Sequence, residues 1–172
     1  MKQPMIDTMT RPKFDNLFTP EKAVKPLIDI FWEYFYKAVI WEPCDPGNSG
    51  ISKALRSMGY RVISTDISTG FDFLKDTPDF NFHLIVTNPP YSQKDKFIER
   101  CLSYKCQSAL LLPLTTLEGI KRGKIFDENC VSVIVLDKRL DFTGKGSCWF
   151  NTSWFFFSEY ESKLYFKSLE ES

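Results

Sequence analysis

The segment of this chain best suited to chemistry is Asn88-Pro89-Pro90-Tyr91. It directly follows residues 83–87, an apolar run with β-branched side chains that predicts a buried strand. Neither proline has an N–H for a sheet ladder, and each proline holds the residue before it in an extended conformation. We therefore expect a stiff loop at the carboxyl end of a strand, which is where open α/β sheets bind their ligands.

This loop would present an amide side chain, a proline carbonyl and an aromatic ring in fixed relative positions. The side-chain oxygen of Asn88 and the carbonyl oxygen of Pro89 can together accept both hydrogens of one planar –NH2 group. The ring of Tyr91 can cover the face of a flat base. The chemistry indicated is the binding of an amine carried by a planar group.

The run VTNPPY resembles the catalytic loop of the S-adenosylmethionine-dependent amino-methyltransferases, a group that includes the DNA adenine-N6 methyltransferases. The resemblance implies S-adenosyl-L-methionine as cofactor and Asn88, Pro89, Pro90 and Tyr91 as catalytic residues. Asn-Pro-Pro-Tyr also occurs in relatives that methylate RNA bases or glutamine side chains. The loop by itself therefore leaves the substrate open among these classes.

The chemistry of adenine explains why such a loop suits an exocyclic amine. The amino lone pair is delocalised into the ring, so the nitrogen is a poor nucleophile. If Asn88 and Pro89 accept its two N–H bonds, the nitrogen becomes more tetrahedral and its lone pair can attack a sulfonium methyl group. The gain is positioning and electrostatic preorganisation, and Asn88 is no general base because an amide has no useful pKa. The target base must be flipped out of a duplex or already unpaired.

A second resemblance concerns the cofactor. The run WEPCDPGNSGISKAL resembles the first cofactor motif of the same family, an acidic turn followed by glycines and a helix. Here the glycines are three residues apart instead of two, and Pro46 is added. The resemblance implies an acid that faces the positively charged amino end of the cofactor and glycines that let the backbone approach it. The cofactor residues expected in this run are Glu42, Pro43, Cys44, Gly47 and Gly50.

A helix start precedes this motif at Phe18, Thr19 and Pro20. Threonine is a good cap, and proline suits a first helical turn. The segment resembles a Thr-Pro element of the family that helps to hold the carboxylate end of the cofactor. Free N–H groups at a helix start are suited to an anion.

Two acidic positions follow the motif. Asp66, with Ile67 beside it, ends a predicted strand, where a carboxylate can accept hydrogen bonds from ribose hydroxyls. Asp72 and Phe73 resemble the family segment whose Asp accepts from the cofactor adenine amine and whose Phe lies against the ring. We expect all four residues in the cofactor site.

Basic and aromatic side chains of the second half are the candidates for substrate binding. Residues 139–157 resemble a stretch of the small phage-type DNA adenine methyltransferases, in which an Arg-x-x-Phe turn leads through a variable loop into an aromatic strand. One ring could clamp the flipped base, and the loop could touch phosphate. The formal net charge is zero, so the basic side chains must gather on one face if DNA is the substrate. The expected substrate contacts are Lys94, Lys121, Arg122, Arg139, Phe142, Lys145, Trp149 and Phe150.

Strand and helix patterns alternate along the chain, which predicts a single-domain Rossmann-like α/β fold. We expect a mostly parallel twisted sheet, helices on both faces and an antiparallel C-terminal strand. Residues 1–17 are predicted to form an arm, and residues 18–172 one methyltransferase domain without room for a separate target-recognition domain. The expected helices cover residues 19–37, 49–58, 93–105 and 116–126. The expected strands cover residues 38–41, 60–65, 83–87, 109–113, 131–136 and 154–157, the last paired with residues 140–143, and a short amphipathic helix follows residue 160.

Composition narrows the compartment. Of the 172 residues, 43% are hydrophobic and 16% aromatic, which is typical of a globular domain. The five cysteines form no CxxC pair and His83 is the only histidine, so we expect no metal site and a reducing, cytoplasmic setting. We expect no membrane span and no signal peptide, because no apolar run is long enough and the first residues lack an apolar core.

The sequence therefore predicts a methyltransferase that acts on adenine N6 in DNA. The alternatives with the same loop are an RNA-adenine or a protein-glutamine methyltransferase. A third alternative is a non-catalytic protein of the same fold that binds nucleic acid or a partner. The altered glycine spacing and the zero net charge motivate that alternative.

Overall fold

The computed structural model describes residues 19–143, 150–160 and 162–169. Phe18, Lys145, Trp149 and the expected arm of residues 1–17 lie outside the described residues. The described strands are β1 (Val39–Glu42), β2 (Arg61–Ser64), β3 (Leu84–Thr87), β4 (Gln107–Pro113), β5 (Cys130–Leu136), β6 (Thr152–Ser158) and β7 (Leu164–Lys167). The described helices are η2 (Glu21–Ala23), α2 (Lys25–Phe35), α3 (Gly50–Ser57), η3 (Ile67–Thr69), η4 (Tyr91–Gln93), α4 (Lys94–Ser103), η5 (Leu114–Leu117) and α5 (Ile120–Glu128).

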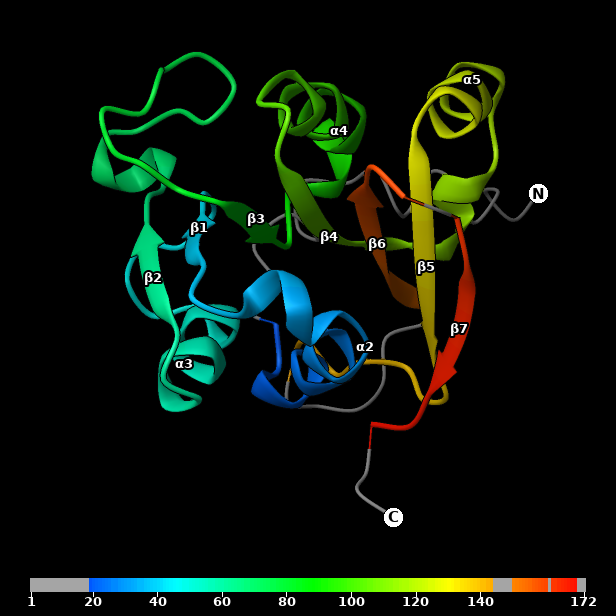
Figure 1. Ribbon diagram of the computed structural model, residues 1–172, viewed down its shortest axis with the longest axis horizontal. Coiled ribbons are helices and arrows are strands. Elements are labelled where there is room, and N and C mark those ends of the chain that lie inside the picture. Colours follow the sequence, from blue (N-terminus) through cyan, green and yellow to red (C-terminus); the bar gives the residue numbers. More distant parts are fainter. Residues whose placement is uncertain (1–18, 144–149, 161, 170–172) are drawn as a thin grey trace, which may run out of the picture.

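The strands form one sheet in the order β2-β1-β3-β4-β6-β5-β7 (Figure 1). All neighbouring strands are parallel except β6, which runs antiparallel between β4 and β5. The expected mostly parallel sheet with an antiparallel strand near the C-terminus is confirmed. Central strands such as β3 are buried on both faces, as expected for parallel strands covered by helices.

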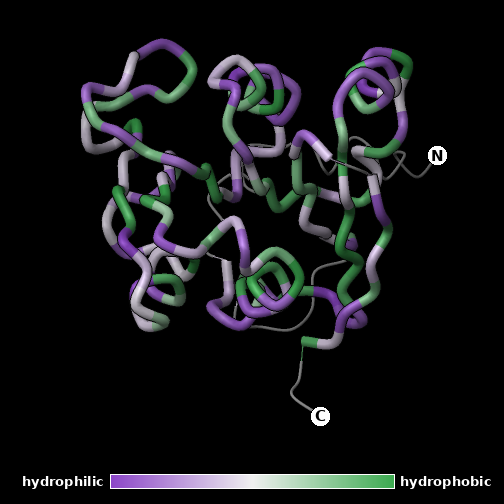
Figure 2. Tube along the Cα trace, in the orientation of Figure 1, coloured by the Kyte–Doolittle hydropathy of each residue, from purple (hydrophilic) through white to green (hydrophobic). Residues whose placement is uncertain are grey.

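Helices cover both faces of the sheet, as the sequence predicted. Figure 1 shows α2 and α3 on one face and α4 and α5 on the other. The helices carry both hydrophilic and hydrophobic residues along their turns, which is typical of amphipathic layers (Figure 2). Alternate side chains of β6 supply both layers, because Trp154 and Phe156 join one buried cluster while Phe155 and Phe157 join the other.

Helix α2 is held on its face by aromatic contacts. Its Leu27, Phe31 and Phe35 are buried and follow one another at intervals of four residues. The Phe31 ring stacks on Phe156, with centroids 3.9 Å apart and planes 11° apart. This packing fixes the N-terminal segment, including η2, against the sheet.

Two local expectations were wrong. The tail after residue 160 forms β7, parallel to β5, and not a helix. Residues 140–143 do not pair with β6, because β4 and β5 already occupy both of its edges. Leu140 and Phe142 are instead buried in the cluster beneath α2.

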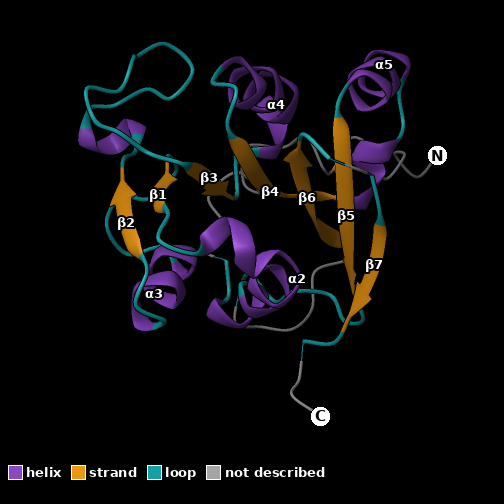
Figure 3. Ribbon diagram, in the orientation of Figure 1, coloured by secondary structure: helices purple, strands orange, loops and turns teal. Residues whose placement is uncertain are grey.

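The carboxyl ends of β1, β2 and β3 point to the same edge of the sheet, since these strands are parallel neighbours. Strand β1 lies between β2 and β3, so the chain passes from β1 to β2 on one side and then crosses to β3 on the other side of β1. This is the switch point at which doubly wound sheets bind ligands. Figure 3 shows that the connection from β2 to β3 is mostly loop after η3.

No helix in the described ranges is both long enough and apolar enough to cross a membrane.

Candidate active site

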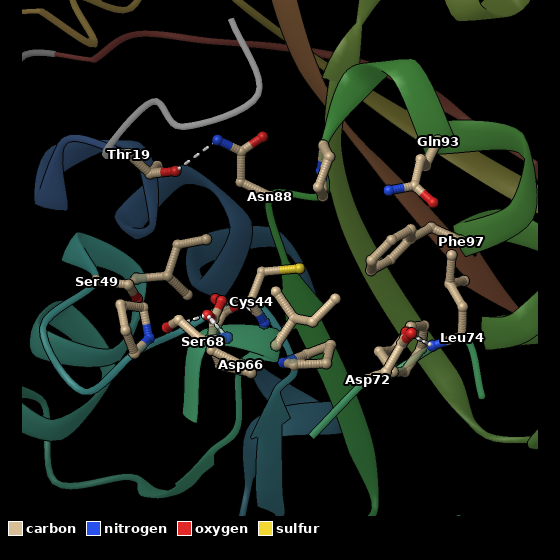
Figure 4. A pocket seen from close by; sticks show the side chains of 17 residues that line it. Thr19, Cys44, Ser49, Asp66, Ser68, Asp72, Leu74, Asn88, Gln93 and Phe97 are labelled. Atoms are coloured by element: carbon tan, nitrogen blue, oxygen red, sulfur yellow. Dashed lines mark hydrogen bonds between the residues drawn. The ribbon is translucent and has the colours of Figure 1, made fainter. Parts of the chain in front are cut away.

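A cavity of about 460 Å³ opens at the carboxyl ends of β1, β2 and β3 (Figure 4). Its walls include residues that the sequence predicted for the cofactor or for catalysis: Thr19, Glu42, Pro43, Cys44, Asp66, Ile67, Asp72, Phe73, Asn88 and Pro90. Its remaining lining residues were not predicted: Pro46, Ser49, Ile51, Ser68, Leu74, Gln93 and Phe97.

Asp45 shapes the loop after β1. This carboxylate is 1% exposed and accepts hydrogen bonds from the backbone N–H of Gly47 (2.8 Å) and of Ser49 (2.7 Å). It also accepts from the Ser64 hydroxyl at 2.6 Å. Burial acts to raise the pKa of Asp45, but the hydrogen bonds from hydroxyls and backbone outweigh burial, so its pKa lies below the usual value. A buried, charged acceptor therefore fixes the extended loop that carries the unusual glycine spacing.

The two glycines of this loop act through the backbone and do not line the cavity. Gly47 has a φ of 113°, which favours glycine. A Cβ at Gly50 would stand 1.9 Å from the carbonyl oxygen of Thr19, so only glycine permits this contact. Next to it, the Ser49 hydroxyl accepts from the Ser52 N–H at 3.1 Å and caps α3.

Glu42 ends β1 at the base of the cavity. It is 1% exposed, and its Oε1 accepts from the Cys44 N–H at 3.2 Å. Its Oε2 is buried without a hydrogen bond of normal geometry in the described structure. Burial raises the pKa of Glu42 to about 8, against the effect of the Thr87 hydroxyl beside this carboxyl, which acts to lower that pKa. Burial also raises the pKa of the neighbouring Cys44 thiol well above its usual value, so this thiol stays protonated.

Asp66 follows β2 and caps η3. Its Oδ1 accepts from the Ser68 N–H at 2.8 Å, and the Thr69 hydroxyl completes a capping box. Ile67, which comes next, is 70% exposed and lines the cavity. An exposed aliphatic side chain at the mouth of a cavity is suited to cover a flat ligand.

Asp72 and Phe73 form the far wall. Asp72 accepts from the Leu74 N–H at 3.0 Å and pairs with Lys75 at 2.8 Å, and the Lys75 hydrogen bond holds the pKa of Asp72 below its usual value. The Phe73 ring stacks on Phe97, with centroids 4.9 Å apart. Both rings line the cavity and give this end an apolar, flat surface.

The catalytic candidate Asn88 lies directly after β3 on the cavity wall. Its Nδ2 donates to the Thr19 hydroxyl oxygen at 3.0 Å (Figure 4). Its Oδ1 is buried and has no hydrogen-bond partner in the described structure. Pro90 lines the cavity, whereas Pro89 is buried and is not among the lining residues. An unused acceptor at this position is suited to an N–H donor of a ligand.

Tyr91 lies outside the cavity lining. Its residue is 3% exposed, and its ring meets the Phe150 ring edge-on, with centroids 5.7 Å apart. The expected stacking of Tyr91 on a base stays a prediction, and it would require this ring to leave its packing. Phe142 and Phe150 are likewise buried, at 6% and 7% exposure.

The basic candidates make contacts within the protein. Arg122 pairs with Asp95 at 3.1 Å and donates to the carbonyls of Thr116 and Glu118. The other contacts are Lys121 with Glu99 at 2.5 Å, Arg139 with the Asn151 side-chain oxygen at 3.0 Å, and Lys94 with the Tyr91 carbonyl at 3.4 Å. None of these four residues lines the cavity, and their substrate contacts remain predictions.

Comparisons with known proteins concern the fold. No protein-family model matches the sequence, and no curated protein sequence matches it significantly. A type I restriction-modification system methyltransferase subunit from Streptococcus thermophilus is similar over 88% of this chain and 47% of its own, with a TM-score of 0.56 and 16% identity. A protein assigned as the modification subunit of a type I restriction enzyme from Vibrio vulnificus is similar over 97% of this chain and 51% of its own, with a TM-score of 0.55 and 9% identity. A protein assigned as a class I S-adenosylmethionine-dependent methyltransferase from Listeria monocytogenes is similar over 90% of this chain and 67% of its own, with a TM-score of 0.60 and 13% identity.

This chain spans about half the length of the two restriction-system subunits. At such identities the likeness shows the fold alone, and the Rossmann-like α/β fold expected from the sequence is confirmed, since these methyltransferases share it. Function has to be argued from the site, because one fold hosts many chemistries.

Proposed function

We propose that this chain binds S-adenosyl-L-methionine in the cavity and transfers its methyl group to the exocyclic N6 amine of adenine in DNA. The observation that carries the proposal is that Asn88 lines the cavity while its Oδ1 atom is buried without a hydrogen-bond partner in the described structure. Buried acceptors are normally paired, so an unpaired one beside a cavity favours a ligand with an N–H donor.

The charge of the cavity supports this cofactor. Three carboxylic acids line it, Glu42, Asp66 and Asp72, and no lysine or arginine is among its described lining residues. Such walls disfavour a ligand rich in phosphate and favour one that brings hydroxyl donors and positive charge, since a cation also favours the ionised form of Glu42, which otherwise keeps its proton below about pH 8. S-adenosyl-L-methionine carries a sulfonium, an ammonium, two ribose hydroxyls and an adenine amine. A volume of about 460 Å³ lies in the usual range of small-molecule sites.

Each acid then has a distinct task. Glu42, at the base, would balance the positively charged amino end. Asp66 would accept from the ribose hydroxyls, with Ile67 covering the adenine ring. Asp72 would accept from the adenine amine, with Phe73 and its partner Phe97 against the ring. The carboxylate-holding role of Phe18, Thr19 and Pro20 remains a prediction from the family resemblance.

S-adenosyl-L-methionine, when bound, supplies an electrophilic methyl group. The protein supplies the orientation of the nucleophile: Asn88 Oδ1 and the Pro89 carbonyl accept the two hydrogens of the target amine. This pairing localises the nitrogen lone pair toward the donor, and it acts by positioning and preorganised electrostatics. The proton leaves after transfer, when the nitrogen is cationic and acidic, so Asn88 needs no basic character.

DNA as the substrate is supported by analogy with two proteins of similar fold, one assigned as the modification subunit of a type I restriction enzyme and one a methyltransferase subunit of a type I restriction-modification system. The zero net charge and the internal pairing of Lys121 and Arg122 leave RNA and protein glutamine as competing substrates. These alternatives present a similar –NH2 group to the same two oxygens.

The test uses the full chain with labelled cofactor and, separately, unmethylated plasmid, total RNA and protein extract. We expect N6-methyladenine in the plasmid by mass spectrometry, and its loss in Asn88→Ala while calorimetry shows nearly unchanged cofactor binding. If the labelled methyl group appears only in RNA or only in protein, that class of molecule and not DNA is the substrate. Failure to bind the cofactor at millimolar concentration would favour the non-catalytic alternative.

A further inference from the structure

Thr19 has a structural partner that its sequence position did not predict. As the expected helix cap, its hydroxyl would accept from the following turn, but η2 has Pro20 at its N-cap position and no side-chain cap. The Thr19 residue is instead 5% exposed, and its hydroxyl oxygen lies 3.0 Å from Nδ2 of Asn88. The hydroxyl therefore serves a residue 69 positions later in the chain.

The orientation of the Asn88 amide decides what the cavity offers a ligand. The two ends of an amide have nearly the same shape but opposite polarity, since the oxygen accepts and the nitrogen donates two hydrogens. If the amide nitrogen pointed toward the cavity, its N–H groups would face the N–H groups of the substrate amine, and no hydrogen bond could form between these donors. With the nitrogen on Thr19, the oxygen is left for the substrate amine, and both ends of the amide are paired once that amine binds.

A hydroxyl can donate as well as accept, so Thr19 alone could hold either orientation. A donor in the cavity removes this ambiguity. Only the orientation in which Thr19 accepts from Nδ2 leaves Oδ1 for the donor. When Thr19 accepts from Nδ2 and the ligand donates to Oδ1, both polar ends of the Asn88 amide have hydrogen-bond partners. Thr19 thus favours the orientation of Asn88 that binds the substrate amine.

The position of Thr19 depends in turn on the loop after β1. Gly50, the first residue of α3, meets the Thr19 backbone so closely that a Cβ there would stand 1.9 Å from the carbonyl oxygen. Ser49, Thr19 and Asn88 all line the cavity. Three segments that are distant in the sequence therefore meet at this place: the segment of Thr19, the loop after β1 and the loop after β3.

We propose that Thr19 is a positioning residue that holds the Asn88 amide with its oxygen toward the substrate amine, and that Gly50 sets the position of Thr19. The proposal rests on the proposed function, in which Asn88 accepts from that amine. It differs from the cofactor-carboxylate role expected for Thr19, and the two roles predict different kinetic effects.

The kinetic test compares Thr19→Val, which removes the hydroxyl at nearly constant volume, with Thr19→Ser, which keeps it. We expect Thr19→Val to lower kcat at saturating cofactor by about tenfold, the scale of one lost hydrogen bond, with the cofactor Kd changed less than about twofold. Thr19→Ser should restore most of kcat. A matched control is Thr116→Val, because Thr116 is fully buried and lies outside the cavity lining. A raised cofactor Kd with unchanged kcat would overturn the proposal and make Thr19 a cofactor ligand.

A second measurement needs no turnover. In protein labelled with ¹⁵N-asparagine, the Asn88 side-chain amide signals are those absent from Asn88→Asp. We expect their hydrogen exchange to be about tenfold faster or more in Thr19→Val than in wild type, and unchanged in Thr116→Val. Equal exchange in Thr19→Val and wild type would overturn the proposal even in an active enzyme. If exchange is faster in Thr19→Val but the wild-type protein methylates no substrate, the Thr19–Asn88 contact is supported and the proposed function is rejected.

Discussion

Glu42 and Asn88 lie at the carboxyl ends of the neighbouring strands β1 and β3, and each has one buried oxygen without a hydrogen-bond partner in the described structure. Buried oxygens of this kind cost free energy unless something donates to them. Their shared cavity is therefore suited to a ligand with donors at two places, where the donor at Glu42 is a cation that displaces the proton this carboxyl otherwise keeps below about pH 8. In the proposed function, one donor belongs to the cofactor and the other to the substrate amine.

The raised pKa of Glu42 predicts how stability changes with pH. Burial raises this pKa from the usual 4.5 to about 8, so the folded protein keeps a proton that the unfolded chain loses above about pH 4.5. The free energy of unfolding should therefore fall as the pH rises from about 4.5 to about 8. In Glu42→Gln the decrease of the free energy of unfolding that is due to Glu42 should disappear, as measured by urea unfolding across that pH range. Parallel pH profiles for the two proteins would contradict the assignment.

The same carboxyl predicts a pH dependence of cofactor binding. A cationic ligand favours the ionised form of Glu42, so binding should release a proton and tighten as the pH approaches about 8. Calorimetry in buffers of different ionisation enthalpy measures that proton. Glu42→Gln is the control, because any pH dependence that remains in it belongs to titration of the ligand itself.

Asp66 should contribute to cofactor affinity directly. Asp66→Ala is expected to weaken binding by about 1–3 kcal/mol, the scale of a lost hydrogen bond to a charged group. Because Asp66 also caps η3, Thr69→Val serves as a control that removes the other half of the capping box without touching the cavity lining. Equal dissociation constants for Asp66→Ala and wild type in calorimetry would remove Asp66 from the site.

Gly50 and Gly123 offer a matched pair of helical glycines. Gly50→Ala should destabilise the protein and lower kcat, because its Cβ would collide with the Thr19 backbone. Gly123→Ala, in α5, meets nothing within 4 Å and should stabilise the protein by up to about 1 kcal/mol through helix propensity. Thermal unfolding and single-turnover rates check both. Similar behaviour of the two variants would argue against the Gly50 contact.

DNA binding by the basic side chains should depend steeply on salt. If these side chains contact two or more phosphates, affinity for a short duplex should fall about tenfold or more between about 50 mM and 200 mM salt. Fluorescence anisotropy measures the slope. A flat response would favour a protein or small-molecule substrate.

Local sequence patterns predicted much of the fold and the chemistry of this chain, because strands, helix starts and strand-end acids leave short-range signals. The strand before Asn88 and the acids Glu42 and Asp66 are examples. The Thr19–Asn88 contact joins residues 69 positions apart and has no local signal. The role of Asp45 had a signal that went unused, since an aspartate two residues before a glycine often accepts from the turn.

The segment after residue 160, which was predicted to be a helix and forms β7, shows where local sequence patterns fail. The β7 sequence, Leu164-Tyr165-Phe166-Lys167, does not alternate apolar and polar residues, so the spacing alone does not distinguish a strand from a short helix. Its conformation is decided by hydrogen bonds to β5, which local patterns do not encode. Gln93, the last residue of η4, and Phe97, in α4, also line the cavity, and their residue types alone do not indicate this.

Strand β6 comes after β5 in the chain but lies between β4 and β5 in the sheet. A polypeptide that ends before Thr152 would therefore leave a gap inside the sheet, with two long apolar strand edges facing each other across it. Unpaired edges of this kind recruit other strands. Premature termination would thus yield an aggregation-prone product, and not a smaller version of the same protein.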